Sequence, residues 1–426
     1  MLQTIFKVVP SYVRQLILVG SLMDLQAKNI KNSVFLMLCI MGFFAIFSST
    51  MSKSPVLKPF TRYLNTPTDW VGFVAAASTI PGILVSLPAA SLSDIYGRKK
   101  FLLIAGFVFA SAPFLYLLIT VWWQLILVRF YHGFATAIFV PVAEASVAEL
   151  FPTKRGERIS LFSSATYVGR VIAPTLGGSI LFLTANNFQL LYLAVGVAGV
   201  TAMIVALPFF AERKPEPAIA PRGTARETVK NLFRGWGTVA RNHDVLIVSF
   251  VQACQYYAYG TVEYFLAGYL PEVVHLNEFL TGITITSIIG VGIFARPYMG
   301  RVSDKIGRRV PIVLGCVISG LPLLVIPFVS DFWLILLLVL IYGFGFATVI
   351  ASTSPAISEL VPEGLVGTSM GFLDTVMDVG QTLGPTLSGF FLSTNLQYRG
   401  IFPSLTFVLI SAGVIFALHG LIHKRS

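Results

Sequence analysis

The chain has 426 residues, of which 55% are hydrophobic and only 12% are charged, with a mean hydropathy of +0.80. A water-soluble domain of this length carries far more charge on its surface, so the composition excludes an ordinary soluble fold. Repeated apolar stretches of 18 residues or more instead indicate membrane-spanning helices. The formal net charge of +11 is also typical of nucleic-acid-binding proteins, and the positions of the basic residues decide between the two interpretations.

Residues 1–30 lack the short apolar core and the small-residue cleavage site of a signal peptide. We predict a cytoplasmic segment here, either a short amphipathic helix on the membrane surface or an irregular tail. Twelve apolar segments follow, and each is close to the ~20 residues that a helix needs to cross ~30 Å of hydrocarbon. They cover approximately residues 33–52, 70–92, 101–120, 122–149, 159–183, 188–211, 245–270, 280–301, 310–329, 332–357, 367–392 and 401–422.

The expected fold class is an all-α membrane protein of twelve transmembrane helices, because a helix satisfies its own backbone hydrogen bonds in lipid. A polar, basic stretch at 212–243 separates six of the segments from the other six. We therefore predict two pseudo-symmetric six-helix halves, residues 31–211 and 244–426, joined by a cytoplasmic linker. The part of the linker that reads "RETVKNLFRGWGTVARN" is predicted to form a surface helix.

The basic residues fix the expected orientation. With both termini in the cytoplasm, 23 of the 30 Lys and Arg residues lie on the inner side, and the outer loops carry only Lys53, Lys58, Arg62 and Arg399. Such a bias follows the positive-inside rule, so we predict a multi-pass protein of the cell inner (plasma) membrane with both termini cytoplasmic. The same distribution argues against nucleic acid as a partner, since the positive charge is spread along one membrane face.

Three sequence landmarks of the first half recur in the second half at an offset of 210 or 211 residues. These are "LSDIYGRKK" (92–100) with "VSDKIGRRV" (302–310), "SVAELFP" (146–152) with "AISELVP" (356–362), and "VGRVIAPTLGG" (168–178) with "VGQTLGPTLSG" (379–389). Landmarks in the same order at a nearly constant spacing indicate two homologous halves. Two such halves with a binding site at their interface are typical of secondary transporters.

These motifs resemble those of the major facilitator superfamily. "ASLSDIYGRKK" (90–100) and "GRVSDKIGRRV" (300–310) are similar to the loop signature of that family, with Ala90 and Ile95 as departures in the first copy. "LILVRFYHGFATA" (125–137) resembles the family's fourth span, where His132 replaces a common Gln. "GRVIAPTLGG" (169–178) resembles the fifth span of twelve-span drug–proton antiporters, with Ala173 in place of Gly. The resemblance covers approximately residues 30–422 and implies alternating access by two rocking halves.

The loop signatures are candidate gating elements. An Asp near a helix end can face the N-terminus of a neighbouring helix, and arginines can pair with carboxylates. The resemblance implies a latch that stabilises the outward-facing state, while the alternative is that the cations only determine topology. The residues concerned are Asp94, Arg98, Asp304 and Arg308.

Three polar residues in the fourth and fifth segments are candidates for substrate binding or proton coupling. Arg129 lies about seven residues into its segment, where a charge is costly unless it is paired, hydrated or able to reach the headgroups. His132, one helical turn away, has a side chain of the type that titrates near neutral pH, although a structural role is the commoner one. Arg170 lies near the membrane midplane, where reaching the headgroups is not an option.

The eleventh segment carries Asp374 and Asp378 one helical turn apart, followed by Gln381 on the same face. Two carboxylates this close repel each other when both are ionised, which suits a proton carrier. The alternative is a salt bridge to Arg170 or Arg129, and both interpretations can hold at different stages of a transport cycle.

The seventh segment presents Gln252, Tyr256, Tyr259 and Glu263 on one helical face. Aromatic rings beside a carboxylate suit an amphipathic or cationic solute, whereas tyrosines near an interface also form ordinary aromatic belts. Glu144 is either a cavity carboxylate or a helix-end group.

Together these features predict a secondary active transporter that exports a small amphipathic or drug-like solute in exchange for protons. The alternatives are a proton-coupled symporter or uniporter of a small organic anion, anchored by Arg129 and Arg170, and a membrane-embedded transferase. No metal-ligand spacing and no nucleotide-binding or catalytic loop supports an enzyme. The expected partners are a small-molecule substrate, protons and the lipid bilayer, and we expect no cofactor, no metal and a monomer.

Overall fold

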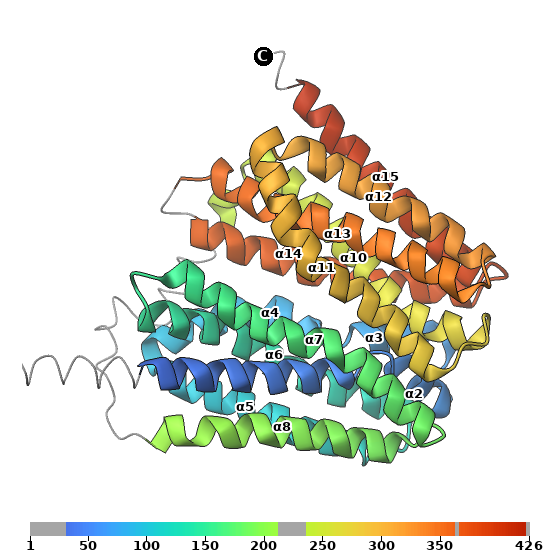
Figure 1. The fold of residues 1–426 in the computed structure, drawn as a ribbon, viewed down its shortest axis with the longest axis horizontal. Coiled ribbons are helices and arrows are strands. Elements are labelled where there is room, and N and C mark those ends of the chain that lie inside the picture. Colours follow the sequence, from blue (N-terminus) through green and yellow to red (C-terminus); the bar gives the residue numbers. More distant parts are fainter. Residues whose placement is uncertain (1–30, 212–235, 363–365, 423–426) are drawn as a thin grey trace, which may run out of the picture.

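The computed structural model describes residues 31–211, 236–362 and 366–422. Within those residues the chain crosses the bundle twelve times as helices and forms no strand (Figure 1). The predicted fold class, twelve transmembrane helices in two six-helix halves, is confirmed. The predicted N-terminal segment and most of the predicted linker lie outside the described residues.

The N-half contains the first six spans. It consists of the helix Lys31–Met51, the short α2 (Leu57–Tyr63), then α3 (Thr68–Ala76), α4 (Ile80–Tyr96), α5 (Arg98–Tyr116), α6 (Trp122–Leu150), α7 (Arg155–Leu183) and α8 (Phe188–Ala211). The C-half consists of α10 (His243–Glu272), α11 (Glu278–Ile306), α12 (Arg309–Val325), the 3-10 turn η1 (Ile326–Phe328), α13 (Phe332–Leu360), α14 (Val366–Leu392) and α15 (Tyr398–Ile422).

Two local features were not predicted. The second apolar segment is broken between α3 and α4, where Thr79 donates its hydroxyl to Ala76 O and Pro81 opens the next helix. The polar connection after the first span contains α2, whose Leu57 and Phe60 are buried. Neither feature interrupts the apolar pattern strongly enough to be visible in hydropathy.

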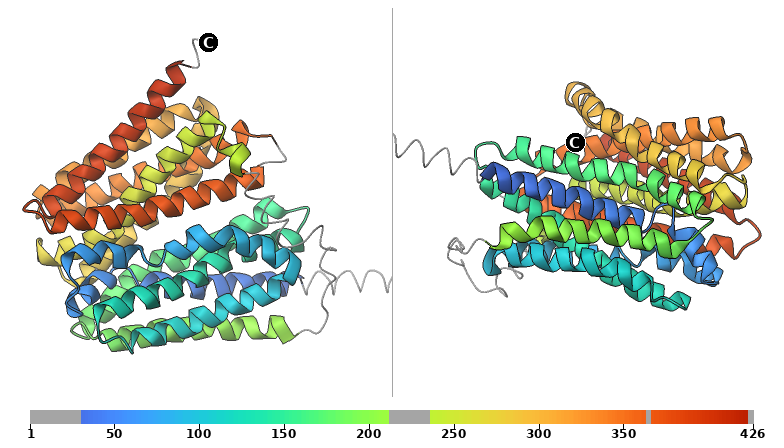
Figure 2. Two further views of the ribbon diagram at one scale, coloured as in Figure 1. Left: turned by 180° about the vertical axis from the view of Figure 1, so that it is seen from behind. Right: turned by 60° about the horizontal axis from the view of Figure 1, so that its bottom comes forward.

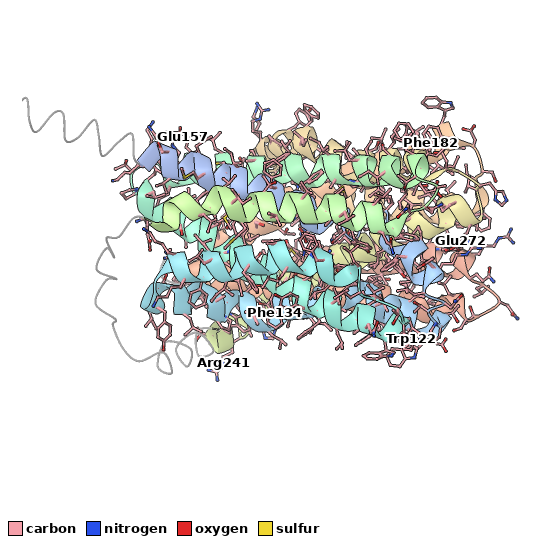
Figure 3. The ribbon with its side chains drawn as sticks, turned by 90° about the horizontal axis from the view of Figure 1, so that it is seen from below. Trp122, Phe134, Glu157, Phe182, Arg241 and Glu272 are labelled. Carbon is pink, nitrogen blue, oxygen red and sulfur yellow. The ribbon has the colours of Figure 1, made fainter. Side chains whose placement is uncertain are left out.

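One end of the bundle, the motif end, carries Gly97 and Gly307, which form the turns of the two loop signatures. The opposite end, the far end, carries α2. Figure 3 places Glu157 and Arg241 at the motif end and Phe182 and Glu272 at the far end. Gly97 has φ +95° and Gly307 has φ +85°. Both glycines adopt a backbone conformation that is costly for other residues, which explains why the repeated signature contains Gly.

Ten spans of the described part are apolar enough by themselves to identify as membrane helices. The two exceptions, α10 and α14, pack against each other along the C-half face that meets the N-half. Their lower hydropathy comes from polar residues, including Glu263, Asp374 and Asp378 at this interface. The helices that look least like membrane spans are therefore those that border the interior between the halves.

The halves meet where α14 packs against α3 and α4, where α7 packs against α11, and where α10 contacts α2. Figure 2 shows the two halves lying one against the other. Small residues permit the approach. A Cβ on Gly72 of α3 would collide with the backbone carbonyl of Pro385 in α14, and a Cβ on Gly282 of α11 would lie 2.5 Å from Pro174 O in α7. Close backbone packing of this kind depends on glycine.

Candidate functional site

A first cavity lies between the halves toward the far end. The N-half contributes Arg129 and residues of α2 to α4, and the C-half contributes residues of α10 and α14. Its lining consists of Lys53, Leu57, Ala75, Ser78, Thr79, Arg129, Gly260, Glu263, Tyr264, Gln381 and Pro385. Lys53 Nζ and Glu263 Oε2 form an ion pair of 3.0 Å across the interface. Glu263, predicted from the polar stripe of the seventh segment, thus has a partner in a residue that sequence reasoning placed in an outer loop.

Arg129 is buried, with 2% of its surface exposed. Its Nε donates to Val74 O at 2.8 Å, and Nη2 donates to Ala75 O at 2.9 Å and to Ser78 Oγ at 2.7 Å. These carbonyls belong to the last turn of α3, where the only backbone donor to them among the described residues is Ala77 N, at 3.4 Å from Val74 O. Arg129 therefore stabilises the break between α3 and α4 and does not extend toward the headgroups.

A second cavity lies among α7, α10, α11 and α13. Its lining consists of Tyr167, Arg170, Tyr256, Tyr259, Ile288, Ile289, Gly292, Arg296, Gly343, Phe346 and Ala347. The structure brings together here three residues predicted from sequence, Arg170, Tyr256 and Tyr259. The rings of Tyr259 and Phe346 stack with centroids 5.0 Å apart, and Tyr256 meets Phe346 edge-on at 5.3 Å.

Arg296 is the residue of this cavity that sequence reasoning did not single out. It lies in "IFARPYMG" of α11, and its guanidinium sits over the Tyr167 ring at 5.0 Å from the ring centre. The sequence did contain a signal for this residue. Arg296 lies ten residues before the end of a 29-residue helix, which is too deep in the membrane for it to belong with the basic residues of the motif end.

Three carboxylates lie along the interface nearer to the motif end. Asp378 of α14 packs against Gly82 of α4, where a Cβ would collide with the carboxylate. Asp374 interacts electrostatically both with Asp378 and with Glu144 of the N-half. Ser163 donates a hydrogen bond of 3.3 Å to Glu144, so this residue faces the interior between α6 and α7. Within the described residues, no ion pair joins Asp374 or Asp378 to Arg129 or Arg170.

Two predicted site residues are buried within a single half, apart from both cavities. His132 is 4% exposed inside the N-half, against Phe109 and within 3.4 Å of the Tyr116 hydroxyl. Gln252 is buried between α10 and α13, where it accepts a hydrogen bond of 2.5 Å from Thr353. Both side chains belong to the packing of one half.

The two loop signatures form matching clusters, one in each half. Arg98 bridges Asp94 and Glu149, with both N–O distances at 2.5 Å. Arg308 bridges Asp304 at 2.5 Å and Glu359 at 2.7 Å. Each arginine also donates to a serine of the preceding helix, at Ser93 and Ser303 respectively. In this structure both clusters are confined to their own halves.

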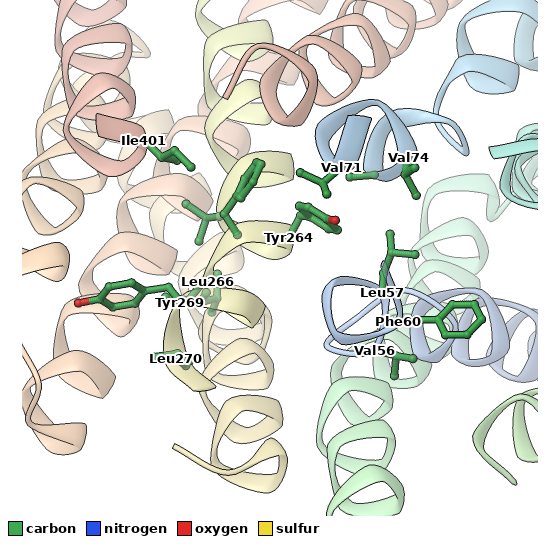
Figure 4. Close-up of a cluster of buried hydrophobic side chains, with 14 of the residues drawn as sticks. Val56, Leu57, Phe60, Val71, Val74, Tyr264, Leu266, Tyr269, Leu270 and Ile401 are labelled. Atoms are coloured by element: carbon green, nitrogen blue, oxygen red, sulfur yellow. The ribbon is translucent and has the colours of Figure 1, made fainter. Parts of the chain in front are cut away.

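The far end is where the halves are joined. Hydrogen bonds between them connect Thr61 to Tyr264, Thr79 to Thr382, Thr175 to Thr286, Tyr167 to Ile289 O and Asn186 to Glu278. Figure 4 shows Tyr264 of the C-half lying among Leu57, Val71 and Val74 of the N-half. These contacts lie near the bundle centre or toward the far end.

Comparisons with known proteins agree with this arrangement. The model of the Major Facilitator Superfamily matches residues 38–296 and 248–423. An uncharacterised MFS-type transporter of Methanocaldococcus jannaschii is 23% identical over 79% of this chain and 86% of its own length. Multidrug resistance protein 2 of Bacillus subtilis is 23% identical over 89% and 94%.

A solved structure has the same fold. It is a bacterial homologue of the human lysosomal transporter Spinster, described as inward-facing and unoccupied, with a TM-score of 0.73, 16% identity and coverage of 91% of this chain and 95% of that one. The two matches of the family model overlap at residues 248–296 and together span residues 38–423, nearly the whole described bundle. This chain therefore belongs to the Major Facilitator Superfamily and is a membrane transporter of that family.

Proposed function

We propose that this transporter exports a small amphipathic solute in exchange for protons, from the plasma membrane and with both termini in the cytoplasm. The relative named multidrug resistance protein supports the solute class. The predicted orientation is supported by the described basic residues, since Arg98, Lys154, Arg158, Lys305 and Arg308 are among those gathered at the motif end.

The observation that carries proton coupling is the position of Asp374 and Asp378. Both lie on α14, which packs against α3 and α4 of the other half. They have no cationic partner within 4 Å among the described residues, yet an ionised carboxylate inside a membrane bundle is costly. Taking up a proton removes that cost, so the charge of this pair biases the packing of the two halves.

The gating part of the proposal follows from the closed far end. The central site of this proposal consists of the second cavity together with Asp374 and Asp378, and the hydrogen bonds between the halves lie near the bundle centre or toward the far end. With a cytoplasmic motif end, this arrangement corresponds to an inward-facing state. We propose that the clusters around Asp94 and Asp304 form contacts between the halves when the motif end closes. Residues 31–211 and 244–426 then rock as units around the central site.

A reconstituted assay tests the proposal. Proteoliposomes with a trapped pH indicator are given a proton gradient together with ethidium, N-phenyl-1-naphthylamine or 8-anilino-1-naphthalenesulfonate, which are cationic, neutral and anionic probes. We expect gradient-driven accumulation of at least one probe by the wild type. Asp378→Asn should abolish this accumulation and retain exchange of preloaded probe, because the binding site is intact while the proton site is lost.

Asp69→Asn is the matched control, since Asp69 is an exposed carboxylate in the first turn of α3. It should behave as the wild type does. Unchanged gradient-driven accumulation in Asp374→Asn, Asp378→Asn and the double variant would rule out this pair as the proton carrier.

A further inference from the structure

We propose that the second cavity is an anion site, in which Arg170 and Arg296 together hold the negatively charged group of an aromatic substrate. The inference rests on the proposed transport function and names the substrate class of the same central site. It does not depend on proton coupling or on the direction of transport.

The first observation is that two arginines from opposite halves line one cavity. Arg170 comes from α7 of the N-half and Arg296 from α11 of the C-half. Among the described residues neither guanidinium has a carboxylate within 4 Å, and the buried Nε of Arg296 has no hydrogen-bond acceptor. Arg129 differs, because backbone carbonyls satisfy its donors.

Two guanidinium groups that line the same cavity repel each other, and each is costly inside the membrane bundle. Asp374 is the carboxylate that acts electrostatically on Tyr256, as Arg170 and Arg296 also do. In the described structure it forms no ion pair with either arginine. A bound anion removes both costs at once. The planar fork of arginine donors suits a carboxylate, sulfonate or phosphate group in particular.

The second observation is the aromatic wall beside the two cations. Tyr259 and Phe346 stack on each other, Tyr256 closes one side, and the Tyr167 ring lies under Arg296. The hydroxyl groups of Tyr256 and Tyr259 donate to no acceptor that the described residues provide. Such walls offer flat apolar faces to a ring and hydrogen-bond donors to its anionic substituent.

The cavity also has a position suited to transport. Arg170 and Arg296 lie on the two helices that join the halves through Tyr167 to Ile289 O and Thr175 to Thr286. An anion held by both arginines therefore bridges the halves, and its affinity changes when α7 and α11 separate. A substrate that binds the two states differently is what alternating access requires.

Isothermal titration calorimetry on the purified full-length protein in detergent tests the site with a matched pair of probes, 1-naphthoate and its neutral amide 1-naphthamide. We expect the wild type to bind the carboxylate and to bind the amide more weakly. Arg170→Gln and Arg296→Gln should each weaken naphthoate by about tenfold or more, the loss expected for one charge-assisted contact, and should leave naphthamide nearly unchanged.

Arg296→Lys keeps the charge but loses the two-pronged contact, so it should bind naphthoate with intermediate affinity. Arg399→Gln is the control, because Arg399 also lies over an aromatic ring, Phe328, but is exposed at the far end. Thermal unfolding of each variant establishes that it is folded, and the lysine variants of both positions replace any glutamine variant that is not.

Failure of naphthoate to bind the wild type at millimolar concentration would overturn the proposal, as would equal affinities in the wild type and both glutamine variants. Tight binding of 1-naphthylmethylammonium that is lost in Asp374→Asn would also overturn it, because the site would then select cations. Each of these outcomes leaves proton-driven export standing, since that proposal is decided by the flux assay on the Asp378 variant.

Discussion

Arg129 demonstrates how a cation can be accommodated inside a membrane bundle without an acidic partner. Its three hydrogen bonds go to the carbonyls of Val74 and Ala75 and to Ser78 Oγ. The carbonyl end of a helix carries partial negative charge, so the guanidinium acts as a C-terminal cap contributed by another helix. Its predicted part in proton coupling or substrate binding remains a prediction, whereas the geometry supports a positioning role at the edge of the first cavity.

Arg129→Met should lower the free energy of unfolding by about 2–4 kcal/mol, because it removes charged donors from buried carbonyls. We expect Arg129→Lys to recover only part of the loss, since a single ammonium cannot reproduce the fork. Thermal unfolding in detergent measures both effects, with Arg62→Met at an exposed position as the control. A normal melting temperature combined with abolished transport would show instead that Arg129 acts in the transport cycle itself.

Helical spacing is reliable where a helix is long, so sequence reasoning grouped some residues that the structure also brings together. Tyr256 and Tyr259, three positions apart on α10, share one cavity. The same reasoning also placed Gln252 on that face, but its carbonyl oxygen is used by Thr353 inside the C-half. Which of two neighbouring helices a polar residue contacts depends on tertiary packing, and periodicity alone does not contain that information.

Among the helices, α10 and α14 combine two requirements that conflict. They must cross the membrane and also present polar groups at the interface, so their hydropathy falls below that of the other spans. The apolar segments at 245–270 and 367–392 were still long enough to identify both from sequence. The break between α3 and α4 was missed because the residues 77–79 are themselves compatible with a continuous helix, and the capping groups come from Thr79 and from Arg129 far along the chain.

The turns between α4 and α5 and between α11 and α12 provide a prediction about gating. Asp94→Asn and Asp304→Asn should each lower turnover about three- to tenfold while the protein stays folded, since a carboxylate facing a helix N-terminus contributes up to ~1 kcal/mol or somewhat more. Arg98 and Arg308 would keep their pairs with Glu149 and Glu359, so the local clusters survive. Initial rates in proteoliposomes, normalised to the amount of inserted protein, measure the effect.

Glu157→Gln is the control for this pair, because Glu157 is an exposed carboxylate at the motif end that pairs with Lys154. Wild-type turnover in both aspartate variants would leave the basic residues of the loop signatures with a topological role only.

For the molecule as a whole, the sequence contains the twelve spans, the division into halves and their repeat, because hydropathy and internal similarity are properties of the chain alone. It does not contain the state in which the halves are packed. The ion pair of Lys53 with Glu263 joins residues 210 positions apart across the interface, and the position of Lys53 in an outer loop does not by itself predict this partner. Arg296 was overlooked for a related reason, since its relation to Arg170 requires α7 and α11 to be side by side.

The ion pair of Lys53 and Glu263 should help to set the balance between the two states. The N–O distance is 3.0 Å, and the side chains are 27% and 9% exposed, so the pair is shielded from solvent and joins the halves directly. Breaking a partly buried pair costs more than breaking a surface pair, so we expect Lys53→Glu or Glu263→Lys to raise the population with an open far end by about tenfold. The double exchange Lys53→Glu with Glu263→Lys restores opposite charges and should return the balance toward that of the wild type.

Spin labels at Tyr63 and Val273, which are exposed on opposite halves at the far end, report the separation by double electron–electron resonance. Identical distance distributions in the wild type, both single variants and the double exchange would mean that the closed far end is maintained by the packing around Tyr264 and the glycine contacts, with no measurable contribution from this charge pair.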